Sequence, residues 1–245
     1  MAKTPHPASA APDGSRLYAV GDIHGRADLL KTLLAEIAAD AASHPAAAKR
    51  LIFLGDYVDR GPASSAVIDM VLHDGLAGFE VVPLMGNHEE MMLRFLEDLA
   101  VGRTWMMNGG DATLRSYGVE PPSMFAGTAL FRHAQQQFAE RLPAGHKAFL
   151  EGLQVSHAEG DYLFVHAGVR PGVAIEKQRT EDLLWIRDEF LDSDRDFGKV
   201  VVHGHSITLD PEFRPNRIGI DTGAYRSNQL TCLVLEGTGR TLLTT

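Results

Sequence analysis

The sequence predicts an α/β fold, because short apolar runs near its N-terminus alternate with helical patterns. Apolar runs at 17–20, 51–54 and 80–84 each stop at a glycine-containing polar turn, and apolar residues recur at helical spacing over 27–42 and 64–76. A strand, a turn and a helix repeated in this order are typical of parallel strands joined by crossover helices. In such sheets, ligands bind beyond the carboxyl ends of the strands.

The second half of the chain has a different pattern. From about Glu89 to Leu153 the residues favour helix and loop, with a break at Pro121-Pro122. Short strands then indicate a second, mixed or antiparallel sheet packed on the first. No linker divides the chain, so we expect a disordered lead-in over 1–15 and a single domain over 16–245. The later strands are expected at 153–157, 162–166, 199–203, 217–220, 230–235 and 240–243.

The composition is that of an ordinary globular protein with an acidic balance. Of its 245 residues, 44% are hydrophobic and 22% are charged, and the formal net charge is −9. This charge argues against a dedicated nucleic-acid binder, which would present a basic face. It would also repel a phosphate substrate, so an acidic protein that handles phosphate needs a local cationic site.

The cysteine content and the lengths of the apolar runs bear on the cellular compartment that we expect for the protein. The single cysteine, Cys232, excludes an intramolecular disulfide, and its apolar surroundings favour a small core residue. No apolar stretch approaches the roughly 20 residues needed to cross a membrane, and residues 1–15 lack the layout of a secretory signal. We therefore expect a cytoplasmic monomer without a membrane or nucleic-acid partner.

Three motifs carry chemistry, and each directly follows a predicted strand. Their glycines permit sharp turns and close approach of the backbone to ligands. Their Asp, His and Asn side chains suit Mn, Zn or Fe. Asp22 and His24 are two residues apart, so on an extended chain both can reach one ion. The motifs are Gly21-Asp22-Ile23-His24-Gly25, Gly55-Asp56-Tyr57-Val58-Asp59-Arg60-Gly61 and Gly86-Asn87-His88-Glu89.

Two later histidines, His166 and His205, repeat the arrangement of strand, histidine and glycine. His166 ends a predicted strand, and His205 ends the sequence His203-Gly204-His205 after another. A histidine at the end of a strand is more often a hydrogen-bonded residue than a metal ligand. From spacing alone, both interpretations remain open.

The three motifs and the two histidines, in this order, resemble the phosphoprotein phosphatase family of serine/threonine phosphatases, bacterial type, within the calcineurin-like metallophosphoesterases. The resemblance runs from Gly21 to His205. It implies a β-sandwich of two mixed sheets flanked by helices, and two divalent ions, with Mn²⁺ expected and Fe or Zn as alternatives. The family pattern places Asp22, His24 and Asp56 on the first ion, and Asp56, as a bridge, with Asn87, His166 and His205 on the second.

The resemblance also assigns roles around the ions. Arg60 and Arg187 match arginines that grip phosphate oxygens. His88 would protonate the leaving alkoxide, and Asp59 would orient that imidazole. The implied reaction is in-line attack on phosphorus by a hydroxide that bridges the ions. A solvated arginine on an amphipathic helix remains the alternative for Arg187, and a structural salt bridge is expected for Glu89.

Two substrate classes are compatible with this pattern. The main expectation is a phosphomonoesterase acting on phosphoproteins or phosphopeptides, with small phosphate esters as further substrates. The alternative is a hydrolase of dinucleoside polyphosphates such as diadenosine tetraphosphate. That relative usually has alanine in place of Asp59 and aspartate in place of Glu89, which favours the phosphoprotein. A non-catalytic phosphopeptide-binding module would be expected to lack ligands or His88, and none is missing.

Two features fall outside these roles. His203 stands where animal members of the family have an arginine, and we expect it to lie beside the ligands or the substrate without binding a metal. The segment Trp105–Gly118, which contains Asn108-Gly109-Gly110-Asp111, resembles a stretch of bacterial relatives. Our hypothesis is that it forms part of a cap over the metal site and governs substrate preference more than metal content.

Overall fold

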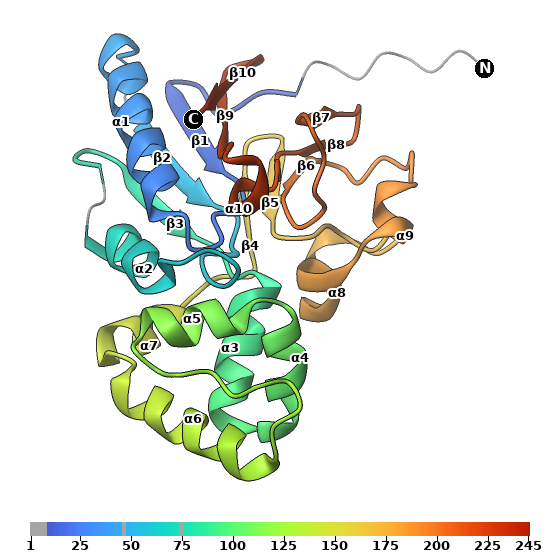
Figure 1. The fold of residues 1–245 in the computed structure, drawn as a ribbon. Helices are drawn as coiled ribbons and strands as arrows, with labels where there is room; N and C mark the ends of the chain where they lie inside the picture. The colour runs from blue at the N-terminus through green and yellow to red at the C-terminus, as the bar shows by residue number, and fades with distance from the viewer. Residues whose placement is uncertain (1–8, 46–47, 74–75) are drawn as a thin grey trace.

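Two mixed five-stranded sheets form the centre of the computed structural model, which describes residues 9–45, 48–73 and 76–245 (Figure 1). The first sheet has the order β10-β9-β1-β2-β3, with β1, β2 and β3 parallel and β9 and β10 antiparallel to their neighbours. Its strands are β1 (Ser15–Val20), β2 (Ala48–Phe53), β3 (Glu80–Pro83), β9 (Thr231–Glu236) and β10 (Gly239–Thr244).

The second sheet has the order β4-β5-β6-β8-β7, in which β5, β6 and β8 are parallel and the two edge strands are antiparallel. Its strands are β4 (Ser156–Glu159), β5 (Tyr162–Val165), β6 (Val200–His203), β7 (Glu212–Phe213) and β8 (Arg217–Gly219). The predicted first strand of this sheet, 153–157, is displaced, because Leu153 packs into a core cluster and Gln154 makes only an isolated bridge to Leu84. The short strand β7 was not predicted.

The strand pattern explains how the sheets pack. Side chains of a strand point alternately to its two faces, and in β1 both faces are buried. Leu17 and Ala19 face the second sheet and pack with Phe164 and Val202 in the layer between the sheets. Tyr18, on the other face, packs toward the helices. The fold is therefore the predicted α/β sandwich of two mixed sheets.

Helices cover both outer faces of the sandwich (Figure 1). Helices α1 (Ala27–Ser43) and α2 (Ser64–His73) pack on the first sheet, close to the predicted ranges. The second sheet is covered by η2 (Ile175–Lys177), α8 (Thr180–Trp185) and α9 (Asp188–Leu191), and α10 (Ala224–Ser227) precedes β9. The predicted end of the second helix includes residues 74 and 75, which lie outside the described residues.

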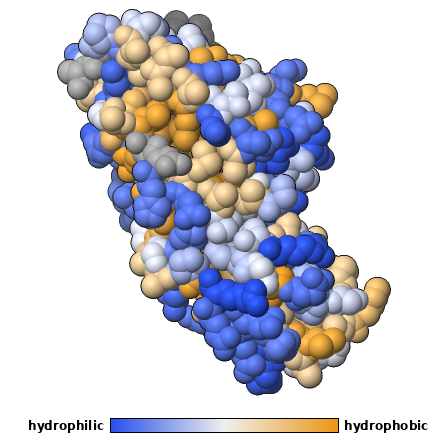
Figure 2. Space-filling view, turned by 60° about the vertical axis from the view of Figure 1, so that its left-hand side comes forward, coloured by the Kyte–Doolittle hydropathy of each residue, from blue (hydrophilic) through white to orange (hydrophobic). Residues whose placement is uncertain are grey.

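A helical lobe lies against one end of the sandwich (Figure 1). On the face shown in Figure 2, its surface is mostly hydrophilic. The lobe begins directly after β3, at the third predicted motif, and returns to the sandwich before β4. It consists of α3 (Asn87–Glu97), η1 (Leu99–Val101), α4 (Gly102–Met107), α5 (Gly110–Ser116), α6 (Thr128–Arg141) and α7 (Ala144–Glu151).

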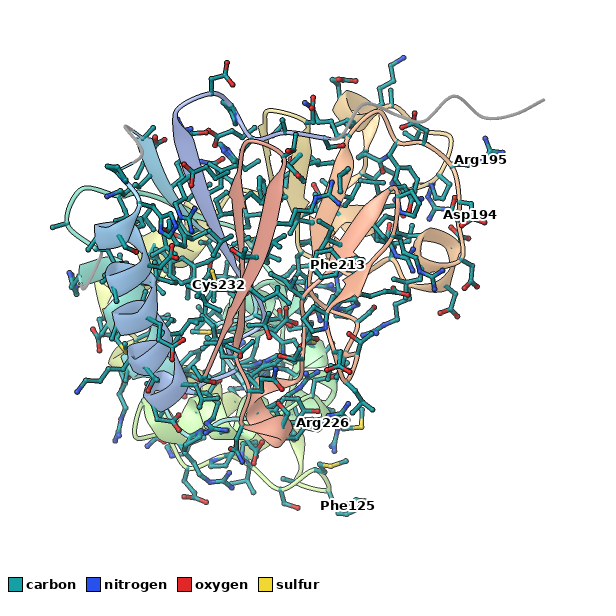
Figure 3. The ribbon with its side chains drawn as sticks, turned by 90° about the horizontal axis from the view of Figure 1, so that it is seen from above. Phe125, Asp194, Arg195, Phe213, Arg226 and Cys232 are labelled. Carbon is teal, nitrogen blue, oxygen red and sulfur yellow. The ribbon has the colours of Figure 1, made fainter. Side chains whose placement is uncertain are left out.

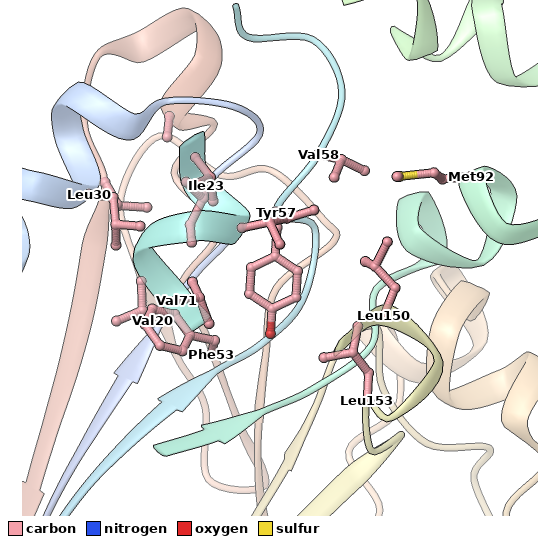
Figure 4. Close-up of a cluster of buried hydrophobic side chains, with 14 of the residues drawn as sticks. Val20, Ile23, Leu30, Phe53, Tyr57, Val58, Val71, Met92, Leu150 and Leu153 are labelled. Carbon is pink, nitrogen blue, oxygen red and sulfur yellow. The ribbon is translucent and has the colours of Figure 1, made fainter. Parts of the chain in front are cut away.

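Buried side chains fix the loop after β2 between the sandwich and this lobe. Tyr57 and Val58 are fully buried and lie between Phe53 on one side and Met92 and Leu150 of the lobe on the other (Figure 4). The hydroxyl of Tyr57 donates to the carbonyl oxygen of Leu84 at 2.8 Å. Apolar and polar residues of this motif therefore have separate tasks, because the apolar ones anchor the loop that carries the polar ones.

Cys232 is buried on β9, which confirms the predicted core role (Figure 3). Burial raises the pKa of its thiol, so the reactive thiolate is disfavoured. None of the helices in the described parts of the chain has the length and hydropathy to cross a membrane.

The predicted disordered lead-in is partly ordered. Residues 1–8 lie outside the described residues, but residues 9–14 lie against the sandwich. The N–H of Ala11 donates to the carbonyl of Gly237 at 2.8 Å, and the hydroxyl of Tyr162 donates to the carbonyl of Ser9. These long-range hydrogen bonds give the polar and small residues of the segment a fixed position that their local pattern does not predict.

Candidate metal centre

Every predicted metal ligand follows the carboxyl end of a strand within a few residues. The carboxyl ends of β1 and β2 point toward the side of the sandwich on which the helical lobe lies (Figure 1). The loops after β1 and β2 are joined where the N–H of His24 donates to the carbonyl oxygen of Asp56 at 2.8 Å. The loops after β5 and β6 are joined because the N–H of Gly204 donates to the carbonyl of His166, also at 2.8 Å. Backbone hydrogen bonds between loops therefore bring distant parts of the sequence to one site.

Three candidate ligands have a left-handed backbone conformation. The φ angle is +46° at His24, +53° at Asp56 and +61° at His205. Residues other than glycine rarely adopt this conformation, which costs on the order of 1–3 kcal/mol per residue and is concentrated at functional sites. The local conformation of these residues is therefore imposed by the surrounding structure and indicates a functional role.

Asp56 lies at the middle of the centre. Its Oδ2 is 3.4 Å from His24 Nε2, and its Oδ1 is 3.4 Å from His166 Nε2. Burial by itself would raise the pKa of Asp56, but the neighbouring imidazoles lower it below its ordinary value. A Cβ on Gly86 would lie 2.1 Å from Asp56 Oδ1, so glycine is required there. One carboxylate with an imidazole nitrogen near each oxygen has the geometry of a bridge between two cations.

Two histidines are held with Nε2 available. The Nδ1–H of His24 donates to the carbonyl of Val58 at 2.8 Å, and the Nδ1–H of His166 donates to the carbonyl of Leu54 at 2.9 Å. Each neutral ring then carries its lone pair on Nε2, which is the form that binds a metal ion. Burial lowers the pKa of both histidines and favours this neutral form.

Asn87 faces one of these lone pairs. Its Oδ1 is 2.8 Å from His166 Nε2. With Nδ1 of His166 acting as the donor to Leu54, both facing atoms are acceptors. A cation bound by both atoms removes the repulsion between them. This contact therefore fits the predicted pairing of Asn87 and His166 on one ion.

His205 offers a further unpaired nitrogen. Its Nε2 is buried and, in the part of the chain that the structure describes, has no hydrogen-bond partner. Burial lowers the pKa of His205, so the ring is neutral. A buried polar atom without a partner requires an explanation, such as a ligand or ion. The nitrogen therefore fits a metal ligand.

Asp22 is held next to His205. The N–H of His205 donates to both carboxylate oxygens of Asp22, at 3.2 and 3.1 Å. A Cβ on Gly204 would lie 2.0 Å from Asp22 Oδ1, so the glycine between the two histidines permits this approach. Burial and then the neighbouring carboxyl of Asp221 raise the pKa of Asp22.

The structure assembles two groups of metal-binding side chains that share Asp56. In each group the ligand atoms lie within 4.8 Å of one another, and all the residues are buried. The members of the second group are among the ligands predicted for the second ion, whereas the first group contains His88 and does not contain Asp22. The carboxylate and imidazole donor atoms, with the unpaired Nε2 of His205, fit two divalent cations. The groups are His24, Asp56 and His88, and Asp56, His166 and His205.

His88 and Asp59, the predicted general acid and its partner (the acid pair), are hydrogen bonded to each other. The Nδ1–H of His88 donates to Asp59 Oδ2 at 2.7 Å, and both residues are buried. Burial by itself would lower the pKa of His88, but the charge of Asp56 and the hydrogen bond to Asp59 raise it above its ordinary value. A raised pKa favours the protonated imidazolium that a general acid requires.

Arg60 lies directly on the centre. Its guanidinium donates from Nη1 to His24 Nε2 at 2.7 Å and from Nη2 to His88 Nε2 at 3.0 Å. It also lies over the ring of Tyr225, 4.9 Å from the centroid. An ion bound by His24 uses the same lone pair, so the guanidinium must leave that nitrogen when the ion binds. Arg60 is the predicted arginine that the structure places in direct contact with the site.

Arg187 is less closely engaged. It is exposed and follows α8, which ends at Trp185, so it does not lie on an amphipathic helix as the alternative interpretation requires. Three effects lower the pKa of His205 most: burial, then the neighbouring His166, and then the positive charge of Arg187. Its charge therefore acts on the second group of ligands.

The salt bridge expected for Glu89 is not found among the described residues. The carboxylate instead accepts hydrogen bonds from the backbone N–H groups of Asp56, Tyr57 and Gly86, at 2.8, 2.8 and 2.9 Å. Burial raises the pKa of Glu89 to about 8, and the backbone donors act against this rise. The sequence interpretation was wrong because the acceptor sites of this carboxylate are filled by turns of the backbone rather than by an arginine.

His203 lies beside the ligands, as expected. Its Nδ1–H donates to the carbonyl of Gly204 at 3.0 Å, and its ring meets that of Phe190 edge-on at 5.1 Å. Burial lowers the pKa of His203 to about 4. The residue belongs to neither metal-binding group.

Two residues near the centre had no assigned role. Asp221 is 1% exposed, and its Oδ2 has no partner in the described residues. Tyr225 packs edge-on against His24, with ring centroids 5.5 Å apart. A signal was available for the acid, because Ile220-Asp221-Thr222-Gly223 repeats the arrangement of strand, acid and glycine seen in the motifs. Tyr225 had no comparable signal.

Comparison with known proteins gives the family. The model of the calcineurin-like phosphoesterase family matches residues 15–228, and the chain belongs to this family. The fold agrees, since a cold-active protein-tyrosine phosphatase of a psychrophilic Shewanella superposes with a TM-score of 0.61 at 17% identity, covering 98% of this chain and 82% of that one. A protein assigned as a diadenosine tetraphosphatase gives 0.62 at 20% identity, covering 97% and 98%.

Relatives found by sequence are named for nucleotide hydrolysis. The chain is 32% identical over 154 residues to a symmetrical bis(5'-nucleosyl)-tetraphosphatase of Dechloromonas aromatica, covering 63% of the chain and 44% of the relative. It is 26% identical to the asymmetrical bis(5'-nucleosyl)-tetraphosphatase PrpE of Anoxybacillus flavithermus, covering 87% of the chain and 88% of the relative. The expected superfamily is therefore confirmed, and these names differ from the protein phosphatase that the motifs resemble.

Proposed function

We propose that the chain hydrolyses dinucleoside tetraphosphates with the help of two divalent ions. The observation that carries the hydrolytic part is the position of Asp56, which has an imidazole nitrogen 3.4 Å from each of its carboxylate oxygens. The substrate class is supported by the asymmetrical tetraphosphatases, which align over 87% of the chain. Bound ions would activate a water molecule and neutralise charge on the transferring phosphate.

In this proposal the side chains of the centre divide the work. Arg60 leaves both His24 and His88 when the site is loaded, which frees Nε2 of His88 to carry a proton. With Arg187, Arg60 then grips phosphate oxygens through planar N–H forks. His88 gives its Nε2 proton to the departing oxygen, while Asp59 keeps Nδ1 oriented. The ligands are those predicted from the sequence: Asp22, His24 and Asp56 for the first ion, and Asp56, Asn87, His166 and His205 for the second.

A second candidate, a phosphoprotein phosphatase, is favoured by the acid pair. A nucleotide leaves as a weakly basic phosphate and needs little help from an acid, whereas the alkoxide of serine or threonine needs a proton. The buried hydrogen bond of 2.7 Å between Asp59 and His88 provides such an acid. A phosphoserine peptide, a phosphotyrosine peptide and small aryl phosphates are therefore the substrates to compare.

Rates on diadenosine tetraphosphate, a phosphoserine peptide and a phosphotyrosine peptide, measured side by side with Mn²⁺, separate the candidates. The leading proposal expects the highest kcat/KM on the dinucleotide. A clear preference for the phosphoserine peptide would replace it with the second candidate.

Metal dependence is tested separately. Removal of ions with a chelator should abolish turnover of every substrate, and Mn²⁺ should restore it. Mn²⁺ is the proposed resident ion, with Zn or Fe as alternatives that metal analysis of the purified protein distinguishes. Turnover that survives complete removal of metal would contradict the proposed centre.

We also propose that the chain acts in the cytoplasm as a monomer without a nucleic-acid partner. The net charge of −9 supports the last point, since nucleic-acid binders present a basic face. Sedimentation of the purified chain, alone and with DNA or RNA, tests the oligomeric state and nucleic-acid binding; a dimer or a stable nucleic-acid complex would contradict the proposal. Cell fractionation tests the location, and recovery outside the cytoplasm would contradict it.

A further inference from the structure

The acid pair is held from the helical lobe. Asp59 is fully buried, and three side-chain donors fill its carboxylate. Oδ2 accepts from His88 Nδ1 at 2.7 Å and from Trp105 Nε1 at 2.8 Å, and Oδ1 accepts from the hydroxyl of Thr113 at 2.6 Å. Two of the three donors thus come from α4 and α5, about 50 residues along the chain from the carboxylate that they bind.

Thr113 contacts this carboxylate and its backbone at once. While its hydroxyl donates to Asp59 Oδ1, its Oγ1 accepts the backbone N–H of Asp59 at 2.8 Å. The φ angle of Asp59 is +72°, so this residue also has a left-handed conformation. The hydroxyl of Ser64 accepts the same N–H at 3.1 Å, so Thr113 is the residue that joins the backbone turn of Asp59 to its carboxylate. Valine would fill the same space without either hydrogen bond.

The glycines of this segment make room for these contacts. A Cβ on Gly110 would lie 2.5 Å from the indole of Trp105, so the first turn of α5 can cover the ring only with glycine there. A Cβ on Gly109 would lie 2.7 Å from the backbone nitrogen of Arg60, whose N–H donates to the carbonyl of Gly109 at 3.1 Å. One structural requirement thus explains the spacing of Trp105, Gly109-Gly110 and Thr113: the two glycines let α4 and α5 approach the loop that carries Asp59 and Arg60.

A purely structural role would need only apolar packing. Trp105 packs on Phe95 and Phe138, and phenylalanine could make those contacts. Packing alone requires neither the indole N–H of Trp105 nor the hydroxyl of Thr113. Both groups nevertheless donate hydrogen bonds to the carboxylate of Asp59. Burying a carboxylate without such donors costs folding free energy. Each donor also restricts the orientations that the carboxylate can adopt.

We propose that Trp105 and Thr113 are positioning residues that hold Asp59, and through it His88, in the orientation needed to protonate the leaving group. The segment over 105–113 therefore supports the acid, which differs from the expected cap that selects substrates. As the phosphorus–oxygen bond to the leaving group breaks and a bond to water oxygen forms, the Nε2 proton of His88 moves to the departing oxygen, and solvent later returns a proton. This inference rests on the proposed hydrolytic function.

The test compares two aryl phosphates, because a poor leaving group depends on the acid more than a good one. For Thr113→Val with Mn²⁺ bound, kcat on phenyl phosphate should fall about tenfold and kcat on p-nitrophenyl phosphate less than about threefold, as expected for loss of a residue that orients a catalytic group. KM and bound metal should be unchanged. Thr113→Ser keeps the hydroxyl and should restore the rate on phenyl phosphate.

Two further variants guard against a folding defect. Trp105→Phe removes the N–H donor and should show the same selective loss on phenyl phosphate. Tyr117→Phe, the matched control, removes a buried hydrogen bond of 2.9 Å to His146 in the same lobe and should leave both rates unchanged. Melting temperatures identify variants that are merely unfolded.

The outcomes separate the inference from the proposed function. Equal losses on both esters for Thr113→Val, or loss of bound metal, would overturn the positioning role while leaving the hydrolase intact. If the wild-type protein turns over neither the esters nor diadenosine tetraphosphate, the proposed function fails as well. If it turns over only the dinucleotide, whose phosphate leaving group needs little help from an acid, the positioning role is overturned while the hydrolase stands.

Discussion

The two halves of the candidate centre, the proposed metal side and the proposed acid side, are held in different ways. On the metal side, strand-end loops are joined by hydrogen bonds between their own backbones, as between His24 and Asp56. On the acid side, Asp59 is held by the side chains of Trp105 and Thr113 from the helical lobe. The metal side therefore depends on the sandwich, and the acid side depends on a region that the sandwich does not contain.

This difference predicts that substitutions can disturb metal binding and proton transfer separately. Metal ligands within short motifs keep their arrangement as long as the loops close. The acid pair needs correct packing between two parts of the molecule. Substitutions on each side should therefore give different combinations of metal content, turnover and stability.

The largest effect is expected from Asp56→Asn. Both candidate metal-binding groups contain Asp56, so loss of its charge should release metal and lower kcat by about 10³-fold or more, since bound ions contribute several kcal/mol. Metal analysis and turnover of p-nitrophenyl phosphate check this. The control is Asp111→Asn, which changes a partly exposed carboxylate of the lobe that pairs with Arg115. Retention of both ions by Asp56→Asn would contradict the shared bridge.

The His88→Asn variant should lose less turnover and should keep its metal. Removal of the general acid should lower kcat on phenyl phosphate about 10²–10³-fold, with a smaller loss on p-nitrophenyl phosphate. Because His88 lies within a candidate metal-binding group, metal content must be measured in the same sample. Release of an ion would show that His88 is a metal ligand. The distinction between a metal side and an acid side would then be contradicted.

A smaller effect is expected from Gly109→Ala, where the lobe meets the loop of Arg60. Its φ angle is +100°, and a Cβ would lie 2.7 Å from the nitrogen of Arg60. We expect a loss of about 1–3 kcal/mol in the free energy of unfolding, with metal affinity unchanged. Urea denaturation measures this. Gly127→Ala, where a Cβ would meet nothing within 4 Å, is the control. Equal stability of the two variants would argue against close packing at this junction.

The smallest effect concerns α8 on the metal side. Arg170 donates to both oxygens of Asp182, at 2.9 and 2.5 Å, and this interaction lowers the pKa of Asp182. A lowered pKa in the folded state gives stability that is complete above the unfolded value and is lost as pH falls through the folded one. Stability should therefore fall from about pH 5 to about pH 2, less steeply in Arg170→Gln. Identical slopes would contradict this contribution.

The parts of the fold that could be predicted are those that local sequence patterns determine. The ranges of α1, β1 and β5 follow from apolar spacing and turn residues. The position of β4 did not follow, because the apolar residues at 153 and 155 lie outside the strand that pairs with β5. Residues 9–14 also escaped prediction, since their partners are far away in the sequence.

The sequence by itself determined the chemical identity of the centre, since the glycines, carboxylates and imidazoles of three short motifs are local and recur after strands. It also indicated a role for His166 and His205 through resemblance. Only the tertiary structure decided that Asp56 lies between His24 and His166, that Glu89 binds backbone N–H groups, and that the lobe holds Asp59. The physical reason is that these contacts join residues about 30 to 110 positions apart, and no local spacing encodes which distant donor reaches a buried acceptor.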